Sequence, residues 1–133
     1  MCRRLQTFEE INIMAKVTPV FRVFDYAKTI EFYVGWLGCK IDWEHKPQNE
    51  PFYMRFSIQG AGFDVSEHHG ECSPGGRFTI GDFQGLTAYH QQLLDKQYIY
   101  NRPGLERVEW DTAILEMTVI DPFSNRIIFN ERT

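Results

Sequence analysis

The sequence predicts an α+β domain of two tandem βαβββ units, forming a curved mixed sheet with helices on its convex side. The chain has 133 residues, 43% of them hydrophobic, which is enough for one domain with one core. Short segments alternate between apolar and polar residues, as half-buried strands do. Strand, cap, helix and hairpin signals then occur twice in the same order, and this repetition indicates two related units.

The first unit covers about residues 17–70. Asp25 is a suitable N-cap for a helix over residues 27–37, whose apolar residues fall on one stripe, and Gly38 ends that helix. Turn residues and alternation predict the strands of this unit at residues 17–24, 39–45, 52–58 and 63–67.

The second unit covers about residues 77–131. Its start, residues 78–82, mirrors residues 21–25 at an offset of 57, and the match continues through the helix. Near the ends of the units, residues 63–67 mirror residues 127–131 at an offset of 64. The remaining β-like segments and the turn of this unit are residues 106–110, 113–119 and 121–125. We therefore expect a domain over residues 16–133, preceded by an N-terminal extension of residues 1–15.

Charge and cysteine content exclude several classes of protein. With 14 Lys and Arg against 18 Asp and Glu, the formal charge is −4, which argues against nucleic-acid and anionic-membrane binding. No apolar run approaches the roughly 20 residues that span a bilayer. Cys2, Cys39 and Cys72 form neither a disulfide framework nor a zinc pattern, and no secretory signal begins the chain, so we expect a cytoplasmic protein.

The concave side of the sheet is the expected ligand cleft. Trp43 and His45 share one face of their strand and form a wall on which a planar ligand stacks, unless Trp43 packs under the helix instead. Strand alternation puts Asp64, Ser66 and His68 on the cleft side, although the His68 segment is equally well explained as a solvated turn. Acidic residues near the cleft favour a cationic ligand or are ordinary surface charge: Asp42, Glu44, Asp64, Glu67 and Glu71.

Several short motifs resemble the glyoxalase/bleomycin-resistance (vicinal oxygen chelate) superfamily over about residues 17–131. They are Phe32-Tyr33, Leu37-Gly38 and Asp121-Pro122-Phe123-Ser124-Asn125. Two further stretches, residues 42–45 and residues 66–70 with Pro74-Gly75, look like the bleomycin-resistance branch. The resemblance implies the tandem βαβββ fold and a homodimer.

Enzymes of this superfamily bind a divalent metal through a His early in the first strand of each unit and a Glu in each last strand. The resemblance places these four positions at Thr18, Gly75, Asp64 and Ile128. Thr, Gly and Ile are not strong ligands for a catalytic cation. The resemblance therefore favours a branch that binds a ligand with no metal, cofactor or catalytic residue.

The expected function is metal-free binding of a bleomycin-type or related ligand, such as a cationic glycopeptide antibiotic, in a groove at the dimer interface. Sequestering the drug in this way would give antibiotic resistance by mass action. The alternatives are an interaction module and a metal-dependent lyase, isomerase or dioxygenase with displaced ligands among His45, Asp64, Glu67, His68 and His69. The residues expected to contact the ligand are Trp43, Tyr53, Ser66, His68 and Trp110.

Overall fold

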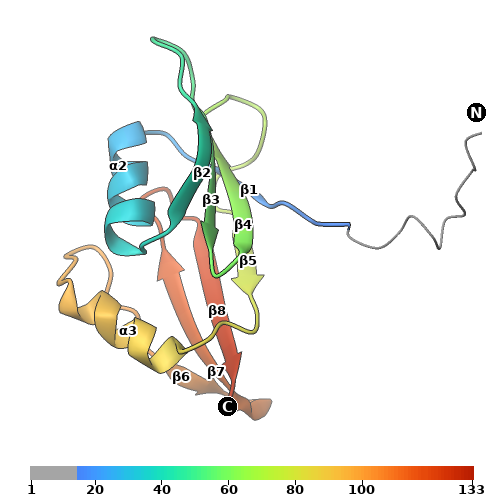
Figure 1. Ribbon diagram of the computed structural model, residues 1–133, viewed down its shortest axis with the longest axis vertical. Helices are drawn as coiled ribbons and strands as arrows, with labels where there is room; N and C mark the ends of the chain where they lie inside the picture. Colours follow the sequence, from blue (N-terminus) through green and yellow to red (C-terminus); the bar gives the residue numbers. More distant parts are fainter. Residues whose placement is uncertain (1–14) are drawn as a thin grey trace, which may run out of the picture.

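The computed structural model describes residues 15–133 and contains two βαβββ units in sequence (Figure 1). The predicted extension, residues 1–15, lies outside the described residues except for its last position. No helix in the described part of the chain is long and apolar enough to cross a membrane. The first unit consists of β1 (Val20–Arg22), α2 (Tyr26–Ile30), η1 (Glu31–Trp36), β2 (Lys40–His45), β3 (Tyr53–Ile58) and β4 (Ala61–Ser66). The second consists of β5 (Arg77–Ile80), α3 (Leu86–Asp95), β6 (Glu106–Val108), β7 (Asp111–Ile120) and β8 (Arg126–Arg132).

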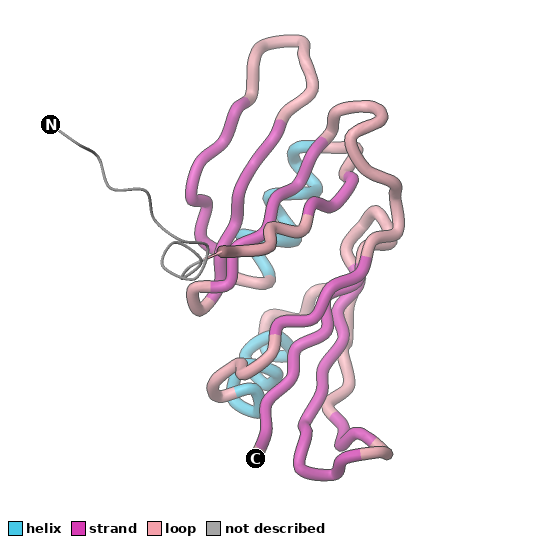
Figure 2. Tube along the Cα trace, turned by 90° about the vertical axis from the view of Figure 1, so that its right-hand side faces the viewer, coloured by secondary structure: helices cyan, strands magenta, loops and turns pink. Residues whose placement is uncertain are grey.

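Each unit forms its own four-stranded mixed sheet. The strand orders are β1-β4-β3-β2 and β5-β8-β7-β6, and in each sheet the first strand pairs in parallel with the last strand of its unit. The helices lie on one side of the two sheets, and Figure 2 shows the sheets from the opposite side, with the strands in front of the helices. The α+β fold predicted from the sequence is confirmed.

The first helix begins and ends where the sequence predicts. Asp25 is its N-cap, and its side chain accepts a hydrogen bond from the backbone N–H of Lys28 at 2.8 Å. After Ile30 the helix widens into the π-helical segment η1, closed by a bond from the N–H of Leu37 to the carbonyl of Phe32 at 2.9 Å. Gly38 follows with φ +77°, a conformation that ends a helix at little cost for glycine.

The second helix starts later than the repeat predicts. Asp82, which mirrors Asp25 in the sequence, is not a cap, and α3 begins four residues further on, at Leu86. Its N-terminus is satisfied from a distant strand instead, because the Glu131 carboxylate on β8 accepts from the N–H groups of Gly85 (3.1 Å) and Leu86 (2.9 Å). This contact joins residues about 45 positions apart, so no local pattern signals it.

Strand pairing also corrects the offset between the ends of the two units. Phe21 on β1 pairs with Val65, and its counterpart Phe78 on β5 pairs with Ile127. Val65 and Ile127 are 62 residues apart, whereas the sequence predicted an offset of 64. The shift of two keeps the side chains on the same faces, since strands have a period of two.

The motifs that carry the family resemblance hold the two units together. The buried Tyr33 hydroxyl donates to the Asp121 carboxylate at 2.7 Å, and burial raises the pKa of Asp121. The Asn125 side chain donates to Asp121 and to the carbonyl of Arg22, both at 2.8 Å, and accepts from the N–H of Gly76 at 2.9 Å. Tyr33, Asp121 and Asn125 therefore specify how the units join, and their role is structural.

Candidate functional site

One face of the first sheet, the side away from α2 and η1, carries polar side chains in two rows across the strands; we call it the open face. Residues paired across neighbouring strands point to the same side of a sheet. The opposite side carries Met54 and Phe56, and the Phe56 ring stacks on Tyr33 of η1. The two rows of the open face are Trp43, Arg55 and Asp64, followed by His45, Tyr53 and Ser66.

Two parallel aromatic rings lie side by side on the open face. The Trp43 and Tyr53 rings are 5.6 Å apart between centroids and 10° from parallel. Trp43 is 44% exposed and does not pack under the helix. The Arg55 guanidinium carbon lies 5.2 Å from the Trp43 ring centroid, a cation–π contact. Rings held in this way offer a flat surface to a third planar group.

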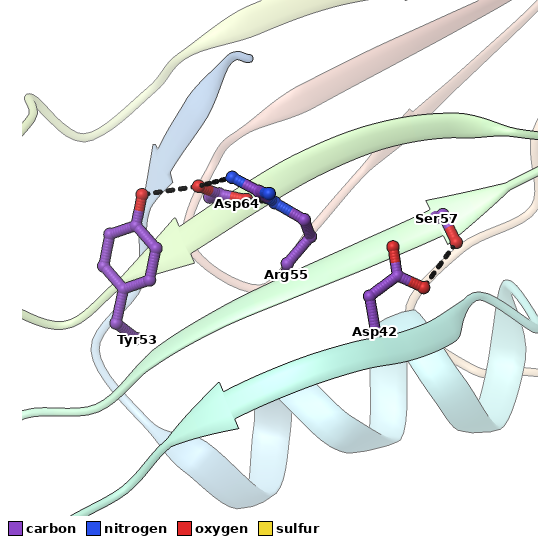
Figure 3. Close-up of polar contacts among 5 residues, drawn as sticks. All are labelled: Asp42, Tyr53, Arg55, Ser57 and Asp64. Atoms are coloured by element: carbon purple, nitrogen blue, oxygen red, sulfur yellow. Dashed lines mark hydrogen bonds and ion pairs between the residues drawn. The ribbon is translucent and has the colours of Figure 1, made fainter.

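A buried carboxylate holds this arrangement in place. Asp64 is 3% exposed and accepts from Arg55 through Nε at 2.6 Å and Nη2 at 3.1 Å (Figure 3). It also accepts from the Tyr53 hydroxyl at 2.6 Å. Burial and the Asp64 charge together raise the pKa of Tyr53, so its hydroxyl stays protonated at neutral pH. Asp64 thus orients Tyr53 and Arg55, the two neighbours of Trp43, and both of its oxygens accept hydrogen bonds from them.

A groove of about 990 Å³ opens at one end of the open face, where residues 16–19 before β1, strands β2 and β3, the β3–β4 turn and β5 meet. This volume is in the range of small-molecule sites. Among the described residues that line it, Lys16, Lys40 and Arg55 are cationic and Asp42 is acidic. Asp42 accepts from the Ser57 hydroxyl at 2.8 Å, as Figure 3 shows. The groove therefore offers mixed charges to a ligand that stacks on the rings beside it.

The opposite end of the open face carries a small hydroxyl–carboxylate–imidazole cluster. The buried Ser66 hydroxyl donates to Glu71 at 2.7 Å and accepts from the backbone N–H of His68 at 3.1 Å. His68 Nδ1 lies 3.7 Å from the second oxygen of Glu71. The sequence predicted Asp64, Ser66 and His68 on this face. Asp64 and Ser66 lie on it, but β4 ends at Ser66, so His68 is in the following loop, where strand alternation does not apply.

The structure brings together most, but not all, of the residues expected to contact a ligand. Trp43, Tyr53 and Ser66 share the open face, and His68 lies at its end. Trp110 does not join them, because it is 82% exposed in the turn between β6 and β7 of the other sheet. Sequence reasoning missed Arg55, although the alternation that placed Tyr53 on the open face also applies to Arg55, two residues later.

The positions at which the superfamily holds a metal do not form a ligand set here. Thr18 lines the groove, Gly75 is in a loop, and Ile128 is 3% exposed. Asp64 is already bonded to Arg55 and Tyr53, and the corrected offset makes Ser66, not Asp64, the counterpart of Ile128. Over residues 15–133, no three or more His, Cys, Asp or Glu side chains come close enough to hold a metal ion. The described residues therefore do not fit the metal of the superfamily's enzymes.

Comparisons with known proteins agree with this fold. The model of a family described as glyoxalase superfamily protein matches residues 2–133, so the chain belongs to the glyoxalase superfamily. No curated protein matches the chain.

Solved structures with this fold include proteins connected with bleomycin. A bleomycin resistance determinant encoded on transposon Tn5 has 16% identity and a TM-score of 0.67, covering 90% of this chain and 98% of that one. A bleomycin-binding protein complexed with bleomycin has 16% identity and a TM-score of 0.65, covering 90% of this chain and 100% of that one. A glyoxalase/bleomycin resistance protein from Catenulispora acidiphila has 15% identity and a TM-score of 0.67, with coverage of 90% and 100%. At these identities, the likeness establishes the shared fold.

Proposed function

We propose that this protein binds a bleomycin-type or related small molecule on the open face of its first sheet and sequesters it without chemical conversion. The observation that carries the proposal is the parallel pair of Trp43 and Tyr53, held by Asp64 and Arg55 beside a groove of about 990 Å³. Rigid aromatic surfaces are suited to planar ligands, and a preorganised site loses little entropy on binding.

The state of the polar groups supports binding over catalysis. A general base needs a free lone pair near the substrate and a pKa close to the working pH. Asp64 instead accepts three hydrogen bonds, and the raised pKa of Tyr53 keeps its proton in place. Metal-assisted chemistry needs about three strong ligands, and the described side chains do not supply them.

The ligand class rests on the fold and on charge. A solved structure with the same fold is a bleomycin-binding protein complexed with bleomycin. The net charge of −4 favours approach of a basic molecule such as a glycopeptide antibiotic. Resistance then follows from mass action, since bound drug is withdrawn in proportion to protein concentration over Kd. Because the groove is open to solvent, we propose that a second copy of the chain completes it in a homodimer.

The test is a calorimetric titration with metal-free bleomycin, with and without EDTA. We expect binding that EDTA does not change. Trp43→Leu should weaken binding by about tenfold, since aromatic stacking contributes about 0.5–1.5 kcal/mol beyond the buried area. Tyr100→Leu is the matched control, because Tyr100 is an exposed aromatic in the second unit. Trp110→Leu reports on the dimer: an affinity loss would show that Trp110 of a second copy reaches the site.

Two results would contradict the proposal. The first is the absence of both binding heat and a thermal shift at millimolar bleomycin. The second is stoichiometric zinc, nickel, manganese or iron in the purified protein that His68→Ala removes. That result would favour the metal-dependent enzyme with ligands around His45, Glu67 and His68.

A further inference from the structure

Arg22 is a buried cation on the same open face as the aromatic pair. Its side chain is on the row of His45, Tyr53 and Ser66, because Arg22 on β1 pairs with Ser66 on β4. The residue is 8% exposed, and its Nη1 atom is buried without a hydrogen-bond partner. Buried arginines are normally paired, because a guanidinium removed from water loses strong hydration.

The surrounding structure holds this cation in place. The Arg22 carbonyl accepts from the Asn125 side chain at 2.8 Å, and the N–H of the next residue, Val23, bonds to the carbonyl of Ser66 at 3.0 Å. The guanidinium carbon lies 4.7 Å from the centroid of the Phe24 ring. A cation–π contact of this kind orients the guanidinium but leaves its N–H groups free to bond an acceptor.

Two acidic groups on or beside the open face are engaged with other residues. Asp64, one row along the open face, is bonded to Arg55 and Tyr53. Glu71 accepts from Ser66 at 2.7 Å and faces His68 at 3.7 Å. Among the ion pairs of residues 15–133, none includes Arg22.

The loop of residues 67–76 adjoins Arg22. Its Cys72 lies near enough for the Arg22 charge to oppose the rise that burial causes in the Cys72 pKa. This loop has neither helix nor strand, and Gly70 and Gly75 in it have φ of +87° and +79°. Glycine adopts these conformations without strain, and the loop lies beside the buried guanidinium.

We propose that Arg22 is a binding residue for a small oxyanion, a carboxylate or a phosphate, at the end of the open face next to loop 67–76. The inference goes beyond the proposed function, because it gives this end of the open face to an oxyanion, bound either as a free anion or as part of a related ligand whose rings stack on Trp43 and Tyr53. A guanidinium bonds both oxygens of such a group through two N–H donors, and the buried setting strengthens these bonds.

The test measures thermal unfolding of the full chain in inorganic phosphate, in acetate and in chloride at equal ionic strength. Wild type should gain about 3 °C or more in one of the two oxyanions, because a ligand that binds only the folded state raises Tm. Arg22→Met should lose this gain. In chloride it should be at least as stable as wild type, because an apolar side chain replaces an unpaired buried charge.

Matched variants separate a specific site from general effects. Arg77→Met removes an exposed arginine from β5, the counterpart of β1, and should keep the gain. Arg22→Lys retains the charge without the planar fork and should bind the oxyanion about tenfold more weakly; it carries the test if Arg22→Met does not fold.

Three outcomes would overturn the inference. One is the absence of an oxyanion-specific gain in wild type, and another is an equal gain in Arg22→Met, which would be an ordinary salt effect. The third is a gain that appears only in Glu71→Gln, which would show that Glu71 neutralises Arg22. The bleomycin titration is read separately. Bleomycin binding without any oxyanion response removes the role of Arg22 and leaves the proposed function. An oxyanion response without bleomycin binding keeps the role of Arg22 and removes the proposed function.

Discussion

Three tyrosine hydroxyls in different environments test how the units are joined, and Tyr33→Phe is the informative change. The Tyr33 hydroxyl is buried and donates to the Asp121 carboxylate at 2.7 Å, whereas Tyr89 donates to the carbonyl of Leu37 at 2.6 Å. A hydrogen bond to a charged group contributes about 1.5–3 kcal/mol and one to a neutral group about 1 kcal/mol. We therefore expect Tyr33→Phe to cost about 2 kcal/mol, or roughly 7 °C in Tm for a domain of this size, and Tyr89→Phe to cost about half as much.

Tyr26→Phe completes the series as the control. Its hydroxyl also donates to a carboxylate, Glu44 at 2.7 Å, but at the surface, where polar pairs contribute about 0.2–1 kcal/mol. Urea unfolding monitored by tryptophan fluorescence gives the three free energies of unfolding. If Tyr33→Phe proves as mild as Tyr26→Phe, the claim that the Tyr33–Asp121 bond joins the units is wrong.

The same variant has a predicted pH dependence. The hydrogen bond from the Tyr33 hydroxyl favours the ionised form of the Asp121 carboxyl. Burial raises the pKa of this carboxyl above its usual 3.8. The bond is therefore worth most at pH values above that raised pKa, and the penalty of Tyr33→Phe should shrink as pH falls through it. A penalty that stays constant from pH 7 to pH 4 would show that Asp121 does not titrate in this range.

Three further predictions concern single sites. Asp64→Asn should lower the pKa of Tyr53 towards 10, so phenolate absorbance should appear at lower pH than in wild type. An unchanged pKa of Tyr53 would mean that Asp64 does not act on it. Burial raises the pKa of Cys39 to about 12. At pH 8 only about one Cys39 thiol in ten thousand is then ionised. In a variant with the other two cysteines replaced by Ser, alkylation of Cys39 should therefore require unfolding. Rapid labelling of the folded variant would contradict this. In Gly76→Ala the new Cβ lies 2.8 Å from a ring carbon of the buried Phe21, so we expect a loss of about 1–3 kcal/mol in urea unfolding, and a neutral result would show that Phe21 can move aside.

Local signals in the chain were sufficient for most of the fold. Alternation with a period of two predicted the strands, and Asp25 and Gly38 marked the ends of the first helix. The start of α3 was not predictable in this way, because its N–H groups are satisfied by Glu131 on β8, about 45 residues away.

The open face was predictable in outline only. Alternation is enough to place Tyr53 and Ser66 on one side of their strands, and the same rule applied to β3 would have added Arg55. For β2 it is wrong, because it puts Trp43 on the same face as Ile41, whereas an irregularity in register between these two residues turns Trp43 to the open face. Alternation does not say which strands are neighbours, so it did not reveal that Arg55 and Tyr53 share the Asp64 carboxylate.

The sequence by itself determined which segments become strands and helices and which side of each strand is polar, because these properties depend on residues a few positions apart. The tertiary structure decided which polar groups are paired: it joined Tyr33 to Asp121 across 88 residues and buried the Arg22 guanidinium without a partner for its Nη1 atom. The physical reason is that the free energy of a buried charge depends on partners supplied by distant strands, and only the packed arrangement of those strands sets the distances.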